Sequence, residues 1–314
     1  MSGEFERIAG IVEALGARAS GIGDDCAVLE NGKGALVVST DLSVEGVHFR
    51  LEWLAHREVG WRAAAAALSD LAAEGATPSA LLAAVMVPRA ASDDELVAVM
   101  RGVGDAAAAA GALVVGGDLS SGPLWSMTIT VLGHAIRPVT RSSARPGDGV
   151  WVTGLLGGAR AALESWRRSE EPSPEARRAF AHPVPRISAG EWLASHGAHA
   201  MIDLSDGLGG DARHLARASG VAIELDLGAV PFADVCIDEA RRLGVPPRQF
   251  AAEGGEDYEL LVALPQEFHS SAAEAFVREC GAALTRVGTV VQGSGLHTSL
   301  DGHPVRLMGF DHFR

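Results

Sequence analysis

The sequence predicts a two-domain protein of mixed class (α/β or α+β), because segments with strand and helix character alternate along its 314 residues. The predicted strands are short runs of apolar and β-branched residues, and the predicted helices carry apolar residues three and four positions apart. A chain of this length suits two domains that each bury a core. Residues 137–149, RPVTRSSARPGDG, have the composition of a linker, so we expect domains over residues 1–138 and 139–314.

The N-terminal domain is expected to consist of a sheet with helices packed against it. Residues 4–15 have apolar side chains at helical spacing, and residues 31–34, NGKG, have the composition of a tight turn that leads into a strand over residues 35–39. Residues 56–74 contain five consecutive alanines, which predicts a helix able to pack closely on a sheet. The other expected elements are a strand over 79–87, a helix over 92–110 that begins with a capping box of Ser92 and Glu95 and ends at Gly111, and strands over 112–115 and 125–132.

The C-terminal domain continues the alternation of strands and helices. Residues 167–185 are charged and contain proline, so we expect an exposed excursion with short helical pieces. Asp301-Gly302 predicts a hairpin turn near the end of the sequence. The expected strands cover 150–153, 200–204, 221–227, 258–264 and 284–291, and the expected helices cover 158–166, 208–218, 234–243 and a segment that ends near Cys280.

The charge and composition exclude several classes of protein. The net charge of -14 argues against a nucleic-acid-binding surface, which needs clustered Lys and Arg. Lys33 is the single lysine, so any phosphate chemistry must rely on arginine, backbone amides or metal ions. The charged start of the sequence lacks the apolar run of a signal peptide, and the other apolar runs are too short to span a membrane. Three cysteines without metal-site spacing fit a reducing compartment, so we expect a cytoplasmic protein.

Acidic residues recur at strand ends, in a helix and beside glycine turns. If four of these positions converge, carboxylates about 4 Å apart repel one another by roughly 1 kcal/mol in water and several-fold more in a protein interior. Such a cluster requires cations, and bound magnesium or manganese ions would suit a polyphosphate substrate. A strand that ends in Ser39-Thr40-Asp41 would add two hydroxyl groups to the oxygen ligands. The acidic positions are Asp24-Asp25, Asp41, Asp70, Asp118, Asp203 to Asp206, and Glu256-Asp257.

The common nucleotide-binding motifs are missing from the sequence. The only Gly-Lys pair, Gly32-Lys33, is followed by glycine rather than by Ser or Thr. Cys26 stands where a dinucleotide fingerprint that starts at Gly21 requires glycine, and no His-Arg-Asp catalytic loop is present. A phosphoryl-transfer enzyme with this sequence must therefore work through metal ions.

Seven motifs, in this order and spacing, resemble those of the thiamine-monophosphate kinase family: GIGDDCAVL, STDLSVEGVHF, ALSDLAAEGATPSALL, VVGGD, TRSSARPGD, IDLSDGL and GGEDYEL. The resemblance runs from Gly21 to the closing GFDHF, and it implies ATP-dependent phosphorylation of thiamine monophosphate to thiamine diphosphate. It also implies the fold of the aminoimidazole ribonucleotide synthetase superfamily, with an N-terminal domain that pairs into a dimer barrel and an α/β C-terminal domain. We therefore expect a homodimer that uses ATP as co-substrate and several magnesium ions (Mg2+), with direct in-line phosphoryl transfer.

The resemblance assigns roles to the residues at matching positions. His48 and Glu256 match positions that face thiamine monophosphate, and Phe310 is a candidate for an aromatic wall of that pocket. The residues expected to be catalytic are Asp41, Asp118, Asp203 and Arg141, the last as a phosphate clamp. The magnesium ligands fall on Asp25, Ser39, Thr40, Asp41, Asp70, Asp118, Asp203 and Asp206, and the ATP contacts fall on Gly117, Asp118, Arg141 and Ser205.

The sequence also departs from the family pattern after Gly-Gly-Asp, where the family often has two threonines and an arginine. This chain has Leu119-Ser120-Ser121 there, which changes the expected ATP contacts of this loop but not the metal role of Asp118. Asp24 and Asp257 are interpreted as turn-forming residues, because neighbouring residues already fill the matching roles. Cys26 is expected to pack in the core.

Two alternatives remain open from the sequence. One is another ATP-using enzyme of the same superfamily, such as a selenophosphate synthetase, an aminoimidazole ribonucleotide synthetase or the hydrogenase-maturation protein. The first would carry a reactive cysteine in an N-terminal loop and the last a C-terminal cysteine, and neither MSGEFERIAG nor GFDHFR contains one. The other alternative is a nucleotide-binding scaffold without catalysis, which the complete acidic set disfavours.

Overall fold

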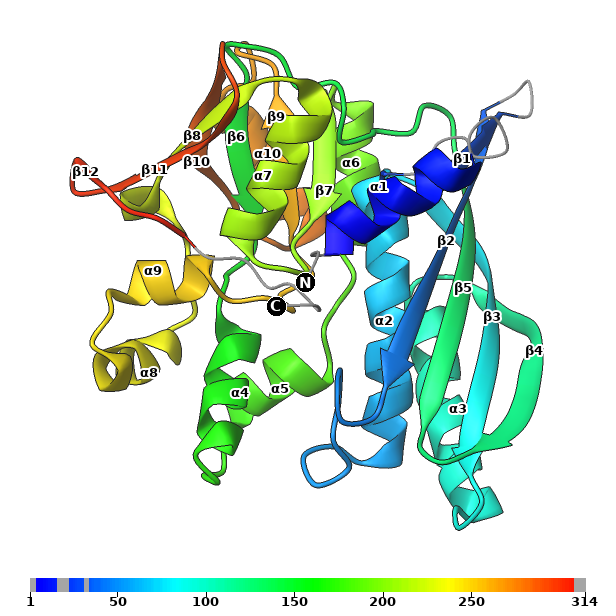
Figure 1. Cartoon of the computed structure of the whole chain (residues 1–314). Helices are drawn as coiled ribbons and strands as arrows, with labels where there is room; N and C mark the ends of the chain where they lie inside the picture. The colour runs from blue at the N-terminus through cyan, green and yellow to red at the C-terminus, as the bar shows by residue number, and fades with distance from the viewer. Residues whose placement is uncertain (1–3, 16–22, 31–33, 308–314) are drawn as a thin grey trace.

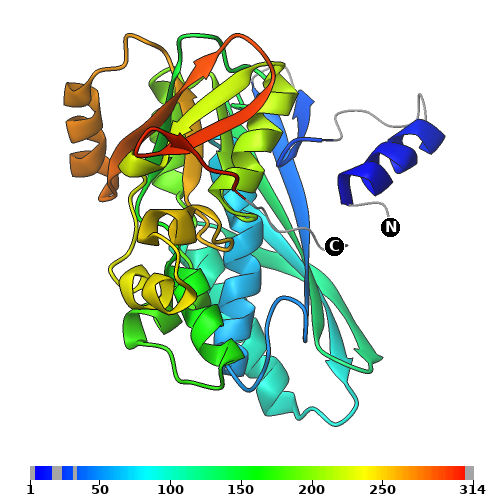
Figure 2. The same ribbon diagram turned by 60° about the vertical axis from the view of Figure 1, so that its left-hand side comes forward.

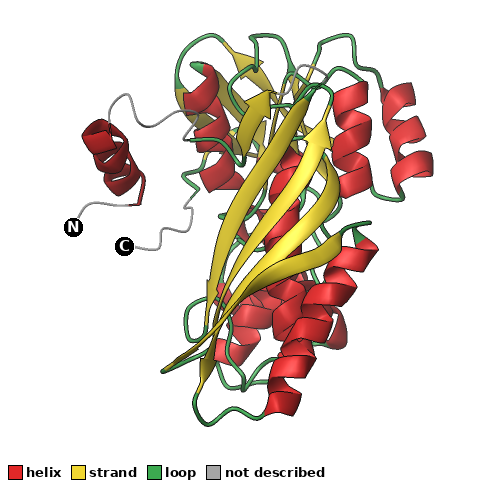
Figure 3. Ribbon diagram, turned by 90° about the vertical axis from the view of Figure 1, so that its right-hand side faces the viewer, coloured by secondary structure: helices red, strands yellow, loops and turns green. Residues whose placement is uncertain are grey.

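The first half of the chain forms a five-stranded sheet with two long helices on one of its faces (Figures 1 and 3). The computed structural model describes residues 4–15, 23–30 and 34–307, and the strand order of this sheet is β1-β2-β5-β3-β4. β3 and β4 are parallel, whereas the other neighbouring strands are antiparallel. The elements of this half are α1 (Glu4–Leu15), β1 (Ala27–Glu30), β2 (Ala35–Val44), α2 (His56–Ala73), β3 (Thr77–Pro88), α3 (Asp93–Ala109), β4 (Leu113–Gly122) and β5 (Ser126–Ala135).

Local sequence signals set several of these elements, as expected. The Ser92 hydroxyl accepts a hydrogen bond from the backbone N–H of Glu95, and the Glu95 carboxylate accepts one from the backbone N–H of Ser92 at 2.7 Å, which is the predicted capping box at the start of α3. Gly111 has φ +77°, a value that glycine adopts readily at a helix end. β1 and β2 pair as the predicted hairpin.

Two sequence predictions were wrong about where strands end. Ser39-Thr40-Asp41 was expected at the end of a strand, but β2 continues to Val44 because β5 offers a pairing partner to each of its residues. Gly117 was expected in a turn after a strand, but it lies within β4, opposite Ala83 of β3. A Cβ atom on Gly117 would lie 1.9 Å from the Ala83 carbonyl oxygen, so glycine there permits close strand pairing. In both cases sheet pairing overrides the local turn signal.

The second half forms a seven-stranded mixed sheet with helices around it, in the order β12-β11-β8-β10-β6-β9-β7. β8 and β11 are parallel, and the other neighbouring pairs are antiparallel. The alternation of strands and helices therefore confirms the mixed α/β class, and α9 is an additional short helix that was not expected. The elements are β6 (Gly149–Thr153), α4 (Gly158–Arg167), α5 (Pro174–Ala181), α6 (Ile187–Ser195), β7 (Ala200–Asp203), α7 (Leu208–Ser219), β8 (Ala222–Asp226), η2 (Leu227–Ala229), α8 (Cys236–Leu243), α9 (Pro247–Ala252), β9 (Leu260–Leu264), α10 (Ser270–Cys280), β10 (Leu284–Val291), β11 (Gly295–Leu300) and β12 (His303–Pro304).

The predicted domain boundary between residues 138 and 139 lies in the segment that separates the two sheets. Figures 2 and 3 show α1 standing apart from both sheets. The described helices include none with the length and hydrophobicity that a transmembrane segment requires.

The helix α2 lies between the two halves and packs against both (Figure 1). Its alanines at 63, 64, 65 and 67 are almost fully buried, and their small side chains allow neighbouring backbones to approach closely. One continuous apolar cluster includes Leu68 and Leu71 of this helix, strands of the first sheet, and Val152 and Ile202 of the second sheet. The two halves therefore share a core through α2.

Glycines set the distance between α2 and its neighbours. A Cβ atom on Gly60 of α2 would lie 1.9 Å from the Val99 carbonyl oxygen of α3, and one on Gly102 of α3 would lie 1.9 Å from the Arg57 carbonyl oxygen of α2. In α6, a Cβ atom on Gly190 would lie 2.0 Å from the Ala72 carbonyl oxygen. These contacts leave no space for a side chain, so α2 is packed backbone to backbone on both sides.

Replacing one of these glycines should therefore destabilise the protein. We expect Gly102→Ala to lower the free energy of unfolding by roughly 1–3 kcal/mol, because α2 and α3 must separate to admit the methyl group. Gly104→Ala is the matched control, because a Cβ atom there meets nothing within 4 Å on the same helix. The control should be neutral or stabilise the protein by up to about 1 kcal/mol through helix propensity. Urea unfolding of both variants measures the effect, and equal changes in the two would contradict the close-packing argument.

Candidate active site

Three carboxylates meet where the two halves of the chain face each other. Asp25 lies two residues before the start of β1, Asp70 lies in α2, and Asp203 ends β7. One oxygen of each lies within 4.8 Å of one oxygen of both others. The convergence of these acidic positions, which the sequence placed far apart, is therefore present in the structure.

Burial makes this acidic cluster unfavourable without a counter-charge. Burial raises the pKa of Asp25 to about 6, although Arg141 lowers it and Asp24 raises it further. Burial, and then the neighbouring aspartates, raise the pKa of Asp70 and of Asp203 well above the usual range. Asp25 Oδ2 is buried and has no hydrogen-bond partner among the described residues. An unsatisfied carboxylate oxygen within a set of oxygen donors fits a divalent cation such as Mg2+.

The strand β2 contributes a second set of oxygen atoms to the cluster. Ser39 Oγ donates a hydrogen bond to Asp70 Oδ2 at 2.5 Å, and burial raises the pKa of Asp41. Side chains alternate along a strand, so Thr40 faces the opposite side of the sheet, where its hydroxyl bonds to that of Thr130 at 3.0 Å. The structure thus brings Ser39 and Asp41 to the cluster and directs the Thr40 side chain away from it.

Arg141 is anchored beside the acidic cluster by two aspartates. Its Nη2 donates to Asp25 Oδ1 at 2.5 Å, and its Nε lies 3.2 Å from Asp24 Oδ1. The Arg141 and Asp25 side chains are only 11% and 5% exposed. Burial alone would lower the pKa of Arg141, but Asp25 and Asp24 raise it overall. The sequence interpretation of Asp24 as a turn former missed this ion pair.

A second group of possible metal ligands lies at the start of α7. Ligand atoms of Asp206, Asp211 and His214 all lie within 4.8 Å of one another, and Asp211 Oδ2 accepts a hydrogen bond from the backbone N–H of Asp206. Burial, and then the nearby arginines, lower the pKa of His214 to about 4, so its imidazole is neutral near pH 7. Of these three residues, only Asp206 was expected from the sequence. Asp211 and His214 lie three positions apart on one helix face, and this spacing could have identified them.

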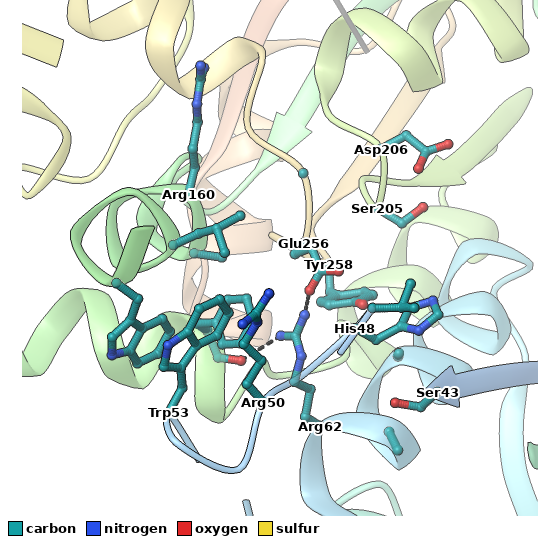
Figure 4. Close-up of a pocket in the computed structure, with 18 of the residues that line it drawn as sticks. Ser43, His48, Arg50, Trp53, Arg62, Arg160, Ser205, Asp206, Glu256 and Tyr258 are labelled. Atoms are coloured by element: carbon teal, nitrogen blue, oxygen red, sulfur yellow. Dashed lines mark hydrogen bonds and ion pairs between the residues drawn. The ribbon is translucent and has the colours of Figure 1, made fainter. Parts of the chain in front are cut away.

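Some members of these groups line one end of a cavity of about 1270 Å³, which we call the central cavity (Figure 4), whereas Asp25, Arg141 and His214 lie behind its wall. Asp41, Asp70, Asp203, Ser205 and Asp206 lie at its acidic end. The other end is aromatic, because Trp53 stacks on Trp166 with ring centroids 5.1 Å apart and both rings line the cavity with Phe180. A cavity of this size is larger than a typical small-molecule site, so it can hold two substrates.

Two of the three residues expected to face thiamine monophosphate line the central cavity. His48 Nδ1 accepts a hydrogen bond from the backbone N–H of Val44 at 3.1 Å, which leaves Nε2 as the protonated nitrogen of the neutral ring. Glu256 lies in a loop with φ +70° and pairs with Arg62, which the sequence analysis did not select. Phe310 lies outside the described residues.

Asp257 and Cys26 make structural contacts. Both carboxylate oxygens of Asp257 accept a hydrogen bond from the Gly157 N–H at 2.9 Å, directly before α4. Asp257 was interpreted as a turn-forming residue, but this contact reaches 100 residues along the chain to the start of α4 instead of closing a local turn. Cys26 is 4% exposed within the core, and burial raises the pKa of its thiol. It packs, as expected.

Gly117 and Asp118 do not reach the central cavity within the described part of the chain. They lie on β4, at the edge of the five-stranded sheet, and β3 and β5 separate them from β2 and Asp41. Their side of the sheet is exposed, and Leu119-Ser120-Ser121 continues the same exposed strand. Within the described part of a single chain, these two residues therefore lie away from the acidic cluster.

Glu74, at the C-terminal end of α2, is a further acidic residue beside the cluster. It is fully buried, and no side chain donates a hydrogen bond to its carboxylate among the described residues. Burial raises its pKa to about 9, and Asp24 and Asp25 add to this effect. Glu74 was not expected at the site, because an acidic residue at a helix end is usually solvated.

The raised pKa of Glu74 predicts a pH-dependent stability. Below about pH 4, Glu74 is protonated in both the folded and the unfolded protein. Between about pH 4 and about pH 9 only the folded protein holds this proton, so the free energy of unfolding falls as pH rises. We expect Glu74→Gln to stabilise the protein increasingly with pH, by up to about 4 kcal/mol more at pH 8.5 than at pH 5.5. Urea unfolding without magnesium at both pH values measures this difference. The exposed Glu224→Gln is the control, and a Glu74→Gln effect independent of pH would contradict the assignment.

Comparisons with known proteins place the chain among relatives of one kind. Family models of AIR synthase related proteins match residues 23–135 with the N-terminal domain and residues 145–301 with the C-terminal domain. The thiamine-monophosphate kinase of Salmonella typhimurium is 36% identical over 314 residues, with 94% of this chain and 92% of the relative covered. That of Mycobacterium tuberculosis (strain H37Rv) is 38% identical over 244 residues, with 77% and 73% covered.

Solved structures of known proteins also resemble this chain. A structure of AaThiL complexed with AMPPCP and TMP has a TM-score of 0.88 at 32% identity, and the match covers 99% of this chain and 97% of that one. The hydrogenase maturation protein HypE in complex with ATP shares the fold, with a TM-score of 0.73 at 20% identity over 90% of this chain and 88% of that one. The resemblance in the seven sequence motifs is thereby confirmed, and the chain belongs to the thiamine-monophosphate kinase family, within the AIR synthase related proteins.

Proposed function

We propose that this chain transfers the γ-phosphoryl group of ATP directly to the phosphate of thiamine monophosphate, which gives thiamine diphosphate and ADP. The observation that carries the proposal is the convergence of Asp25 with Asp70 and Asp203, the last two of which line the acidic end of a cavity with an aromatic far end. The family membership supports the choice of substrates, because the AaThiL structure holds an ATP analogue and TMP. The acidic end suits the phosphates and the aromatic end suits a heterocycle.

The residues of the acidic cluster are proposed to hold several magnesium ions. Asp25, Asp70 and Asp203 would be shared ligands, with Asp41 and Ser39 beside them and Asp206 in the neighbouring group. Thr40 could contribute only through its backbone carbonyl, because its side chain faces the other side of β2. Bound magnesium would neutralise phosphate oxygens and lower the repulsion between the two anionic substrates.

The chemistry needs no side-chain nucleophile. An oxygen of the acceptor phosphate, which is largely ionised near pH 7, attacks the γ-phosphorus in line with the bond to the β,γ-bridging oxygen. That bond breaks, and ADP leaves with its electron pair. The contribution of the chain is to hold both substrates and to stabilise the charge, with Arg141 and Ser205 proposed to contact ATP. His48 Nε2–H, Glu256 and Phe310 are proposed to face thiamine monophosphate.

We further propose that the active protein is a homodimer, formed through the open face of the five-stranded sheet. Figure 3 shows this face without covering helices, and several large apolar side chains on its strands are exposed. Exposed apolar surface on a long edge strand favours association with another chain. Gly117 and Asp118 lie on that strand, so their proposed ATP and metal roles depend on the dimer. The exposed residues on this open face are Leu42, Leu82 and Leu113.

The proposed reaction predicts magnesium-dependent product formation. With ATP, thiamine monophosphate and magnesium, chromatography should detect thiamine diphosphate and ADP in equal amounts, and chelation of magnesium should abolish both. Asp203→Asn should lower kcat by more than about 100-fold while the protein remains folded, because a metal ligand is lost. Asp238→Asn is the control, because Asp238 is exposed and pairs only with Arg241 among the ion pairs of the described chain.

Two outcomes would contradict this proposal. Binding of ATP without formation of either product would exclude the kinase reaction. Near-normal rates of Asp203→Asn at saturating magnesium would remove the metal role from the acidic cluster, even if the reaction itself occurs.

The proposed dimer predicts a mass of twice 32.5 kDa in solution. Light scattering coupled to size exclusion should give this mass for the wild type and a mass near 32.5 kDa for Leu82→Asp combined with Leu113→Asp, because each charge interrupts the apolar open face. Val97→Asp, at an exposed apolar residue on α3, should remain dimeric and is the control. A fully active wild-type protein that stays monomeric would exclude the dimer.

A further inference from the structure

Arg62 is a buried arginine in the wall of the central cavity (Figure 4). It lies on α2, is 3% exposed, and donates a hydrogen bond from Nη1 to the Phe180 carbonyl oxygen at 2.6 Å. Its guanidinium lies over the Phe180 ring, 3.8 Å from the centroid, and 5.9 Å from that of Tyr258. These contacts with Phe180 and Tyr258 fix the position of the guanidinium without any contribution from the Glu256 side chain.

A second nitrogen of this guanidinium, Nη2, forms an ion pair with Glu256. Arg62 Nη2 meets Glu256 Oε2, and this oxygen is fully buried. The Glu256 side chain as a whole is 31% exposed, whereas that of Arg62 is 4% exposed, so the rest of the glutamate faces the central cavity. Arg62 therefore holds one carboxylate oxygen and leaves the other side of the glutamate available to a ligand.

The backbone around Glu256 is held in a conformation that suits this arrangement. Glu256 has φ +70° and Tyr258 has φ +51°, which are uncommon values for residues with a side chain. The loop is attached to the segment after β7 by hydrogen bonds from Glu256 N to Ser205 O at 2.8 Å and from Tyr258 N to Leu204 O at 2.9 Å. The loop thus fixes the Glu256 backbone, and the ion pair fixes its carboxylate.

The electrostatic surroundings explain why such an anchor is needed. Glu256 shares the central cavity with Asp41, Asp70, Asp203 and Asp206, which all repel a further carboxylate. Without a fixed positive partner, the side chain would turn toward solvent or toward bound cations. A planar guanidinium with several donors can hold the Phe180 carbonyl and the Glu256 carboxylate together, which a lysine ammonium on a flexible stem does less well.

We propose that Arg62 is a positioning residue for substrate recognition: it holds the Glu256 carboxylate at the cavity wall, where the free oxygen receives the nitrogen heterocycles of thiamine monophosphate. The inference rests on the proposed function, in which Glu256 faces that substrate. Arg62 acts through Glu256 and not on the phosphates, because its own side chain is almost completely covered. Its loss should therefore weaken thiamine monophosphate binding and leave ATP binding and the phosphoryl-transfer step largely unchanged.

A double-mutant cycle on the full-length protein tests this role. We expect Arg62→Met and Glu256→Gln each to raise the KM for thiamine monophosphate about tenfold, with the KM for ATP and kcat within about threefold of wild type. The double variant should also show about a tenfold increase rather than a hundredfold one, because Arg62 acts through Glu256. Arg62→Lys should give an intermediate KM. Arg57→Met, on the same helix and 64% exposed, is the control and should behave as wild type.

The possible outcomes separate the inference from the proposed function. A wild-type protein that makes no thiamine diphosphate overturns the proposed function. An active wild type with independent, multiplicative effects of the two substitutions overturns the inference, as does an Arg62→Met variant with equal losses for both substrates. If Arg62→Met does not fold, Arg62→Lys with and without Glu256→Gln provides the same cycle, and additive effects there overturn the inference.

Discussion

The main constraint on this structure is the repulsion among carboxylates that lie close together between its two halves. Asp25, Asp70 and Asp203 come from a loop, a helix and a strand end, and each contributes an oxygen to one small volume. Burial makes this arrangement unfavourable, so the surrounding protein must hold it in place. Arg141 offsets part of the charge through its contacts with Asp24 and Asp25, and the apolar core around α2 supplies the remaining stabilisation. The cluster is the kind of strained, unsatisfied site that proteins retain for function.

The packing of α2 determines where these carboxylates lie. Alanines and glycines along the helix allow α3 and α6 to approach its backbone, and this brings Asp70 between the two sheets. The same helix carries Arg62 to the wall of the central cavity. One element therefore sets both the acidic end of the cavity and the position of the Glu256 loop. Small residues in α2 serve the geometry of the site as well as the stability of the core.

The sequence predicted the elements with strong local signals and the acidic positions, but not how distant segments pair. The capping box at Ser92 and the convergence of Asp25, Asp70 and Asp203 could be expected, because helix caps are local and the family motifs fix the aspartates. Strand pairing places Ser39 within β2 and Asp118 at a sheet edge. Turn-forming residues in the local sequence do not reveal which strands pair. Arg62 and Glu74 were missed because a buried charge has no sequence signature of its own.

The shared core has a consequence for the motions of the protein. Opening the two halves as rigid bodies would expose apolar side chains of α2 and break the contact between Gly190 and Ala72, as well as the ion pair that links Arg177 to Glu58. Hinge motion of whole domains is therefore disfavoured. Reactants and products therefore exchange through the mouth of the central cavity, and their release is a local event within an otherwise rigid frame.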